Sequence, residues 1–318
     1  MAEVTVVLMA YGTPRTREEI EPYYTDIRRG NAPTPEALAD LTARYDALGG
    51  TSPLAARTEA QRDALQRALD DAAPGQFHVA LGLKHADPKV EAAVDQLAAE
   101  GFTRIVGLVL APHYSAYSVG QYHGRASERA AHHGIEFVGI DSWATEPAMI
   151  EFVAADLRRR LDAMPTDTKV LFTAHSLPQR IVAAGDPYPD ELRSTAEAVA
   201  AAAGLSGWSN WAIAWQSAGR TPEPWLGPDI LTVIDDLAAV GVMRVVLSHG
   251  GGPSEAGAFA QLVRRQPTME LTVAGGVQNL DGIRRLRDAG VAALILGEPL
   301  FSGAISLDAA RSVADPRQ

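Results

Sequence analysis

Residues 7–14 read VLMAYGTP, and residues 170–178 read VLFTAHSLP. Each stretch is an apolar run followed by an alanine, a ring-bearing residue and a turn that closes in proline. A second pair, GFTRIVGLVLAPHYS and GVMRVVLSHGG, repeats less closely in the same order. The repeats predict two similar halves, each opening on a buried strand that carries a ring, Tyr11 or His175, at its carboxyl end.

Around these stretches, apolar runs rich in Val, Ile and Leu alternate with longer amphipathic stretches of helical spacing. This alternation is typical of a parallel sheet covered by helices. We predict an α/β fold of two similar doubly wound halves, residues 1–145 and 146–318, with a ligand cleft between them. The predicted strands are 4–10, 77–83, 104–110, 137–140, 169–174, 211–215 and 244–247, and the predicted helices include 58–72, 89–100, 149–164 and 190–203.

Composition removes several classes of function. The 318 residues include no cysteine, which excludes disulfides, thiolate zinc sites, cysteine nucleophiles and cysteine-bound iron–sulfur clusters. A formal net charge of -11 argues against broad nucleic-acid binding, because phosphate contacts need clustered Lys and Arg. No apolar run approaches the ~20 residues of a membrane span, and the N-terminus has no export signal. We therefore expect a cytoplasmic protein, and we expect it to act as a monomer.

Tyr11 and His175 are the candidate catalytic residues, because ligands of open α/β sheets sit beyond the carboxyl ends of the strands. A neutral imidazole at His175 can bind a metal ion or accept a proton, although a loop histidine held by hydrogen bonds has the same sequence context. A phenol at Tyr11 can coordinate iron or pack on a flat ligand, and the alternative is a turn tyrosine. His113 and Gln216 fall at comparable strand ends.

A ring-rich segment follows another predicted strand. Residues 112–122, PHYSAYSVGQY, contain three tyrosines, one histidine and two serines. Such rings suit a large planar ligand with a polar rim, or else pack under a loop. Arg28, Arg29 and Lys84 could pair with ligand carboxylates, or could be ordinary surface charges.

Longer motifs occur in the order MAYGTPRTREEIEPYYTDIRRG, YDALGGTSPLA, GLKH, LAPHYSAYSVGQY, AHSLP, GDPYPDEL and WQSAGRTPEPWLGPDI. Together they resemble the coproporphyrin ferrochelatases of Gram-positive bacteria, which are class II chelatases, over residues 1 to about 240. The resemblance implies that ferrous iron is inserted into coproporphyrin III to give coproheme. Both are substrates, and no organic cofactor or iron–sulfur cluster is implied.

The resemblance also implies roles for individual residues. His175 in AHSLP corresponds to the histidine that binds the metal or takes the pyrrole protons, and Tyr11 in AYGTP to the tyrosine near the opposite face of the macrocycle. Two pyrrole protons must leave as iron arrives, so a base and a metal path are needed together. The pocket positions expected to contact the propionates or the porphyrin rim are Arg28, Ser52, Lys84 and Tyr122.

From about residue 240 the resemblance ends. The family motif Gly-Phe-x-x-Asp-His-x-Glu would place a glutamate opposite the histidine, but Gly257 stands there, with Glu255 and His249 as the nearest candidates. One alternative is therefore a porphyrin- or coproheme-binding protein without catalysis, and another is a cobalt chelatase.

The stretch from residue 269 resembles the last units of phosphate-binding (β/α)8 barrels such as phosphoribosyl isomerases. Backbone amides of its loop glycines could hold a phosphate, which makes a sugar-phosphate binder a further alternative. The other interpretation is that these units only complete a parallel sheet. The loop glycines are Gly275, Gly276, Gly297 and Gly303.

Overall fold

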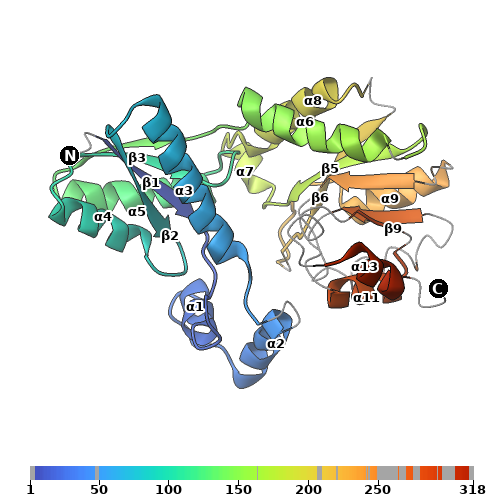
Figure 1. Cartoon of the computed structure of the whole chain (residues 1–318), viewed down its shortest axis with the longest axis horizontal. Helices are drawn as coiled ribbons and strands as arrows, with labels where there is room; N and C mark the ends of the chain where they lie inside the picture. Colours follow the sequence, from blue (N-terminus) through green and yellow to red (C-terminus); the bar gives the residue numbers. More distant parts are fainter. Residues whose placement is uncertain are drawn as a thin grey trace. The chain divides into compact units, whose positions relative to one another are not determined.

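The computed structural model describes residues 4–46, 50–162, 164–205, 210–219, 221–240, 242, 244–248, 264, 270–274, 280–291, 293–295 and 305–314. The chain forms two compact units, Met1–Trp143 and Ala144–Gln318. Each unit is built on its own parallel sheet with helices packed against it, which confirms the α/β prediction (Figure 1). Among the described residues, no helix combines the length and the apolar character needed to cross a membrane.

The first unit alternates strands and helices after an initial helical pair. Its strands are β1 (Val4–Ala10), β2 (Phe77–Leu83), β3 (Arg104–Val109) and β4 (Glu136–Ile140). Its helices are α1 (Ile20–Ile27), α2 (Pro35–Asp46), α3 (Leu54–Ala72), α4 (Val90–Ala99) and α5 (Val119–His132). The predicted strand bounds agree to within one residue. Helix α5 begins inside the ring-rich segment, so Tyr122 lies on a helix.

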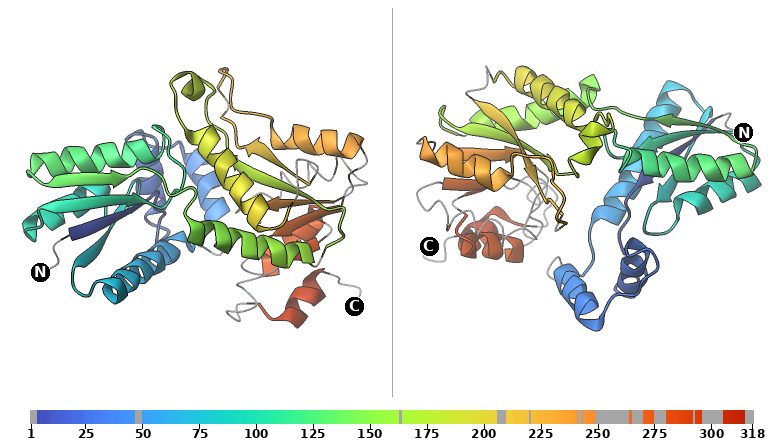
Figure 2. Two further views of the ribbon diagram at one scale, coloured as in Figure 1. Left: turned by 90° about the horizontal axis from the view of Figure 1, so that it is seen from above. Right: turned by 180° about the vertical axis from the view of Figure 1, so that it is seen from behind.

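The sheet of the first unit has the order β2-β1-β3-β4, with all pairs parallel. Side chains of β1 alternate between its two faces, because successive residues of a strand point to opposite sides. Val7 and Met9 pack with residues of α4 and α5, whereas Val6 and Leu8 pack with residues of α3. Figure 2 shows the sheet lying between α3 and the pair α4 and α5.

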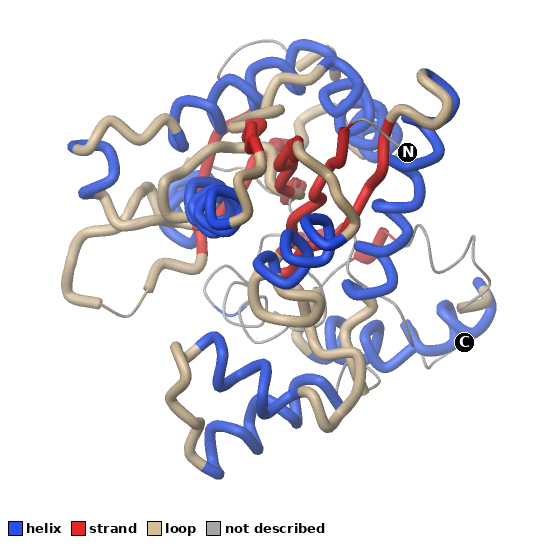
Figure 3. Tube along the Cα trace, turned by 90° about the vertical axis from the view of Figure 1, so that its left-hand side faces the viewer, coloured by secondary structure: helices blue, strands red, loops and turns tan. Residues whose placement is uncertain are grey.

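Helices α1 and α2 interrupt the path from β1 to α3. They pack against each other and lie away from the sheet of their unit (Figures 1 and 3). A buried hydrogen bond of 3.2 Å joins the hydroxyl of Tyr45 on α2 to Thr13 Oγ1, just after β1. This bond ties the helical pair to the turn that carries Tyr11.

The second unit contains β5 (Lys169–His175), β6 (Trp211–Gln216), β7 (Arg244–Ser248), β8 (Glu270–Ala274) and β9 (Ala293–Ile295). Its helices are α6 (Pro147–Asp162), α7 (Arg180–Ala183), α8 (Tyr188–Ala202), α9 (Ile230–Ala239), α11 (Leu280–Asp288) and α13 (Leu307–Ala314). The strands pair in parallel in the order β6-β5-β7-β8-β9. Val170 and Phe172 pack with α6 and α8, and Leu171 packs with α9, α11 and α13, so both faces of this sheet are covered.

The two sheets confirm the predicted internal duplication. Four strands of the second sheet, β6-β5-β7-β8, repeat the order β2-β1-β3-β4 of the first. β1 therefore corresponds to β5, and β3 to β7, as the repeated motifs indicate. Tyr11 follows β1 directly and His175 is the last residue of β5, so the two rings occupy equivalent places in their units.

The tail after residue 240 extends the second sheet. β8 pairs with β7 and β9 pairs with β8, both in parallel, and α11 and α13 pack on the core beneath them. The interpretation that these units complete a sheet is therefore confirmed. The residues for which other roles were considered, His249, Glu255, Gly257, Gly275, Gly276, Gly297 and Gly303, lie outside the described residues.

Candidate functional site

In the first unit, the candidate residues gather where β1 and β2 end. The pairing of these strands continues past Ala10 and Leu83, because Lys84 N donates to Ala10 O at 2.9 Å and His85 N donates to Tyr11 O at 3.0 Å. The first residues after both strands are thus held side by side. Gly12 turns the chain away with a φ of +83°, a conformation that glycine adopts without strain.

Tyr11 presents its ring to solvent and to one neighbouring ring. Its side chain is 44% exposed, and its ring centroid lies 4.5 Å from that of His85 at an interplanar angle of 56°. Partial burial raises the pKa of the Tyr11 phenol, and nearby Tyr45 and Asp26 raise it further. The phenol is therefore protonated at neutral pH and can donate a hydrogen bond or offer its ring as a contact face.

His85 is oriented by a carboxylate. Its Nδ1 lies 2.6 Å from Asp26 Oδ2, and Asp26 Oδ1 accepts from Lys89 Nζ at 2.8 Å. Burial lowers the pKa of His85 despite the neighbouring carboxylate. A neutral imidazole must carry its proton on Nδ1 to make this contact, which leaves the lone pair on Nε2.

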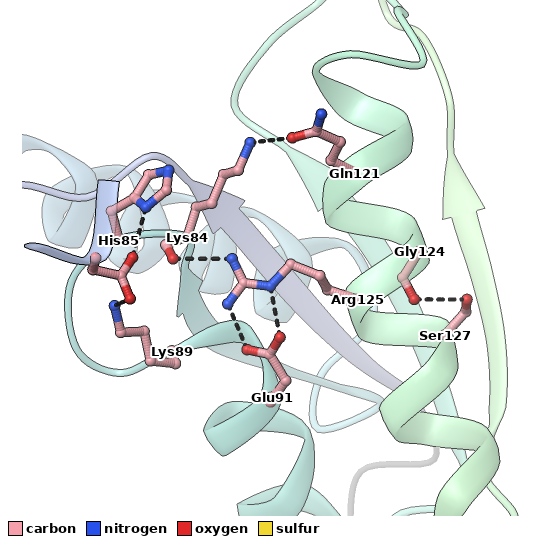
Figure 4. Close-up of polar contacts among 9 residues, drawn as sticks. Lys84, His85, Lys89, Glu91, Gln121, Gly124, Arg125 and Ser127 are labelled. Atoms are coloured by element: carbon pink, nitrogen blue, oxygen red, sulfur yellow. Dashed lines mark hydrogen bonds and ion pairs between the residues drawn. The ribbon is translucent and has the colours of Figure 1, made fainter. Parts of the chain in front are cut away.

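Lys84 lies against helix α5. Its Nζ donates to Gln121 Oε1 at 2.5 Å and lies 5.2 Å from the ring centroid of Tyr122, within reach of a cation–π contact. Burial lowers the pKa of Lys84, and the charge of Arg125 adds to this. Figure 4 shows the lysine side chain extending along α5 toward Gln121.

Tyr122 contributes mainly to packing in the first unit. It is only 5% exposed and belongs to the core formed by β1, α4 and α5. Burial raises the pKa of its hydroxyl. Tyr122, the last residue of the ring-rich segment, therefore packs in the core and offers its ring as a contact for the Lys84 ammonium group.

Arg28 and Ser52, the other two predicted pocket residues, make local contacts in the structure. Arg28 is exposed at the end of α1, where Nε donates to Asn31 O at 3.3 Å and the guanidinium lies 5.6 Å from the Tyr24 ring centroid. Ser52 Oγ accepts from Leu54 N at 3.2 Å, at the start of α3. The structure thus brings together Tyr11, Lys84 and Tyr122, and records no contact of Arg28 or Ser52 with them among the described residues.

In the second unit, His175 ends β5 with an exposed side chain. It pairs in register with Gln216 of β6, and its carbonyl accepts from the Tyr188 hydroxyl at 3.2 Å. Partial burial lowers the pKa of the His175 imidazole. The ring is therefore neutral near pH 7, the form that can take a proton or bind a metal ion.

The turn after His175 is held by hydrogen bonds to Gln216 and Leu226. Ser176 N donates to Gln216 O at 2.7 Å, and its buried hydroxyl donates to Leu226 O at 2.8 Å. Leu226 N in turn donates to Leu177 O at 2.9 Å. These bonds fix the backbone that follows the histidine, and the His175 side chain stays exposed.

Sequence reasoning missed the polar residues that surround the first strand end. Asp26, His85, Lys89 and Arg125 all contact or support a predicted site residue. His85 could have been recognised, because it stands next to Lys84 at a strand end within the quoted GLKH motif. Asp26 could also have been noticed, because it lies within a quoted motif two residues before Arg28, whereas Arg125 lies on α5 beyond the quoted motifs.

Comparison with known proteins identifies the same family as the ordered sequence motifs. The sequence model of the ferrochelatase family matches residues 3–252. A coproporphyrin III ferrochelatase of Halalkalibacterium halodurans is 46% identical over 239 residues, 74% of this chain and 76% of the relative. One from Oceanobacillus iheyensis is 42% identical over 240 residues, with the same shares covered.

Among solved structures, the sirohydrochlorin chelatase SirB from Bacillus subtilis subspecies spizizenii, in complex with cobalt, matches with a TM-score of 0.47 and 10% identity. That match covers 100% of this chain and 97% of the other, at a similarity too low to bear on function. The family model, by contrast, matches most of this chain, and the two relatives are matched over about three quarters of both sequences at more than 40% identity. The chain belongs to the ferrochelatase family.

Proposed function

We propose that this protein inserts ferrous iron into coproporphyrin III to give coproheme. The observation that carries the proposal is the equivalent placement of Tyr11 and His175 at corresponding strand ends of two units with the same strand order. The relatives named coproporphyrin III ferrochelatase support the choice of porphyrin and metal. We further propose that the protein works in the cytoplasm, as a monomer, without an organic cofactor or an iron–sulfur cluster.

His175 is the proposed base and metal ligand. Metalation replaces two pyrrole N–H protons by one Fe²⁺ ion, so two protons must be accepted for each ion inserted. Because burial lowers the pKa of His175, its imidazole is neutral near pH 7 and its lone pair can take a pyrrole proton or guide the ion. In the product, the four pyrrole nitrogens hold the iron, so the protein needs only a transient ligand.

Tyr11 is the proposed contact for the face of the macrocycle. Its exposed ring, supported by His85, can pack on a flat aromatic ligand, and its protonated hydroxyl can act as a hydrogen-bond donor. A rigid contact that favours a bent porphyrin over a flat one would expose the nitrogen lone pairs and lower the barrier.

Lys84 is the proposed partner of a propionate, since its ammonium group is held by Gln121 and Tyr122 and its backbone N donates to Ala10 O, next to Tyr11. Arg28, as an exposed guanidinium, is a second candidate for a propionate. Ser52 and Tyr122 are proposed to border the porphyrin rim. Ser52 Oγ accepts from Leu54 N and Tyr122 packs in the core, which supports a role in shape more than in binding charge.

Anaerobic metalation tests the proposal. Purified protein is mixed with coproporphyrin III and ferrous iron under reducing conditions, and the Soret band is followed. A shift of the band to that of coproheme, with many turnovers per protein, is the expected result. Binding without turnover would instead identify a coproheme-binding protein, and faster reaction with cobalt than with iron would identify a cobalt chelatase.

A further inference from the structure

The backbone from which Lys84 projects is held by Arg125. Nη1 of Arg125, on α5, donates to the carbonyl oxygen of Lys84 at 2.9 Å. Figure 4 shows the guanidinium group lying between this carbonyl and the carboxylate of Glu91. The contact joins the loop after β2 to a helix that lies about forty residues further along the chain.

Arg125 is itself fixed by a bidentate ion pair. Its Nε and Nη2 donate to the two carboxylate oxygens of Glu91 on α4, each at 2.6 Å. The hydrogen bonds to Glu91 raise the pKa of Arg125. Because a guanidinium is a rigid planar fork, two bonds to Glu91 also set the direction of the third bond, to Lys84.

Three residues of α5 thus hold one lysine. Gln121 accepts from the amine, Tyr122 places its ring beneath the amine, and Arg125 fixes the carbonyl. Lys84 would otherwise carry substantial rotamer freedom, and ordering it on binding would weaken affinity. A lysine held in advance offers its ammonium to a carboxylate without that loss.

We propose that Arg125 is a positioning residue that holds Lys84 ready for a propionate of the porphyrin. The inference rests on the proposed function, because it takes the anionic partner of Lys84 to be a substrate propionate. Arg125 acts through Lys84, and its role is therefore in substrate affinity and not in the metal-insertion step.

The chain contains a matched control one turn further along the same two helices. Arg129 on α5 pairs with both carboxylate oxygens of Asp95 on α4, just as Arg125 pairs with Glu91. Within the described part of the chain, Arg129 hydrogen-bonds only to Asp95 and makes no bond to Lys84. Replacing either arginine therefore removes one α4–α5 ion pair, but only replacement of Arg125 also removes a hydrogen bond to Lys84.

The experiment compares Arg125→Gln, Arg129→Gln, Lys84→Met and the double variant Lys84→Met/Arg125→Gln. Coproporphyrin III affinity is measured from fluorescence quenching, and kcat and KM from anaerobic metalation. We expect Arg125→Gln to weaken porphyrin binding about tenfold, the scale of one charge-assisted contact, with kcat nearly unchanged. Arg129→Gln should bind like the wild type, and Arg125→Gln should add nothing to Lys84→Met.

Two results would overturn the role of Arg125 and leave the proposed function intact. One is an equal loss of affinity in Arg125→Gln and Arg129→Gln, which would mean a general loosening of α4 against α5. The other is a further tenfold loss when Arg125→Gln is added to Lys84→Met. If Arg125→Gln does not fold, Glu91→Gln provides the same comparison against Asp95→Asn. Failure of the wild type to bind coproporphyrin III would overturn the proposed function as well, and is seen before any variant is made.

Discussion

Replacing Gly12 by alanine should destabilise the turn that carries Tyr11, and the structure gives the size of the loss in free energy of unfolding. At its φ of +83°, an L-residue is strained by about 1–2 kcal/mol. An added Cβ would also lie 2.8 Å from Ala86 Cβ, 3.0 Å from Ala86 N and 3.2 Å from Leu83 Cβ. Overpacking of this kind costs about 1–3 kcal/mol, so the expected total is about 2–5 kcal/mol.

A small shift of Ala86 cannot relieve this clash, because hydrogen bonds hold the backbone of the two residues before it. Lys84 N and His85 N donate to Ala10 O and Tyr11 O at 2.9 and 3.0 Å. Moving Ala86 away from a new Cβ would pull on these bonds and separate His85 from Tyr11. We therefore expect weaker coproporphyrin III binding in addition to lower stability.

Gly134→Ala is the matched control within the same unit. Gly134 has a φ of +68° after α5, and an added Cβ would meet nothing within 4 Å. Only the backbone strain of about 1–2 kcal/mol should appear there. The two variants are compared by hydrogen exchange of peptides from β1 and β3, because each unit can unfold by itself in a chain of this size. Equal destabilisation by the two substitutions would refute the close-approach argument.

Three further outcomes are expected. Burial lowers the pKa of His113 to about 4, so the unfolded chain binds more protons below about pH 6.5 and stability is lost as the pH falls toward 4. At pH 5.5 the loss is about 1 kcal/mol, and His113→Gln should remove it. The urea midpoints of the variant at pH 7.5 and pH 5.5 test this, and a difference between them as large as that of the wild type would contradict it. Asp26→Asn should destabilise the first unit by about 1 kcal/mol, because the charge-assisted bonds to His85 and Lys89 are weakened. The effect is no larger because solvent partly screens the carboxylate, which is 39% exposed. Hydrogen exchange of the first unit that is unchanged from the wild type would argue against this prediction. His175→Ala should lower the rate of iron insertion about 10²–10⁴-fold while coproporphyrin III still binds, and equal loss of both in the metalation and quenching assays would contradict its role as base.

Much of the fold could be predicted because its signals are local. A run such as VLMA at the start of the chain is apolar on both faces, which only a strand covered by helices on both sides can bury. A similar run, VLFTA, precedes His175, so the duplication and the position of both rings could be predicted from the sequence. The helical pair α1 and α2 was not predicted, because each of these short helices buries a single residue, Ile20 in α1 and Tyr45 in α2.

The supports of the site could not be read in the same way. Lys84 is visible in GLKH, but Gln121 and Arg125 lie on α5, 37 and 41 residues further along the chain. Glu91 is near Lys84 in sequence, but charged residues on helices usually face solvent. Ser52 was predicted as a pocket residue, whereas the structure shows that its hydroxyl accepts a backbone hydrogen bond at the start of α3. From the sequence alone, a serine suits a ligand pocket and a helix start equally well.

By itself, the sequence determined the two-unit α/β architecture, the ring at each leading strand end and the family, because strand periodicity and motif order are properties of contiguous residues. Only the tertiary structure decided that the tail continues the second sheet and that α5 holds Lys84. The physical reason is the same in both cases. Strand neighbours and ion-pair partners are chosen by packing between distant segments, and the spacing of residues along the chain carries no record of that choice.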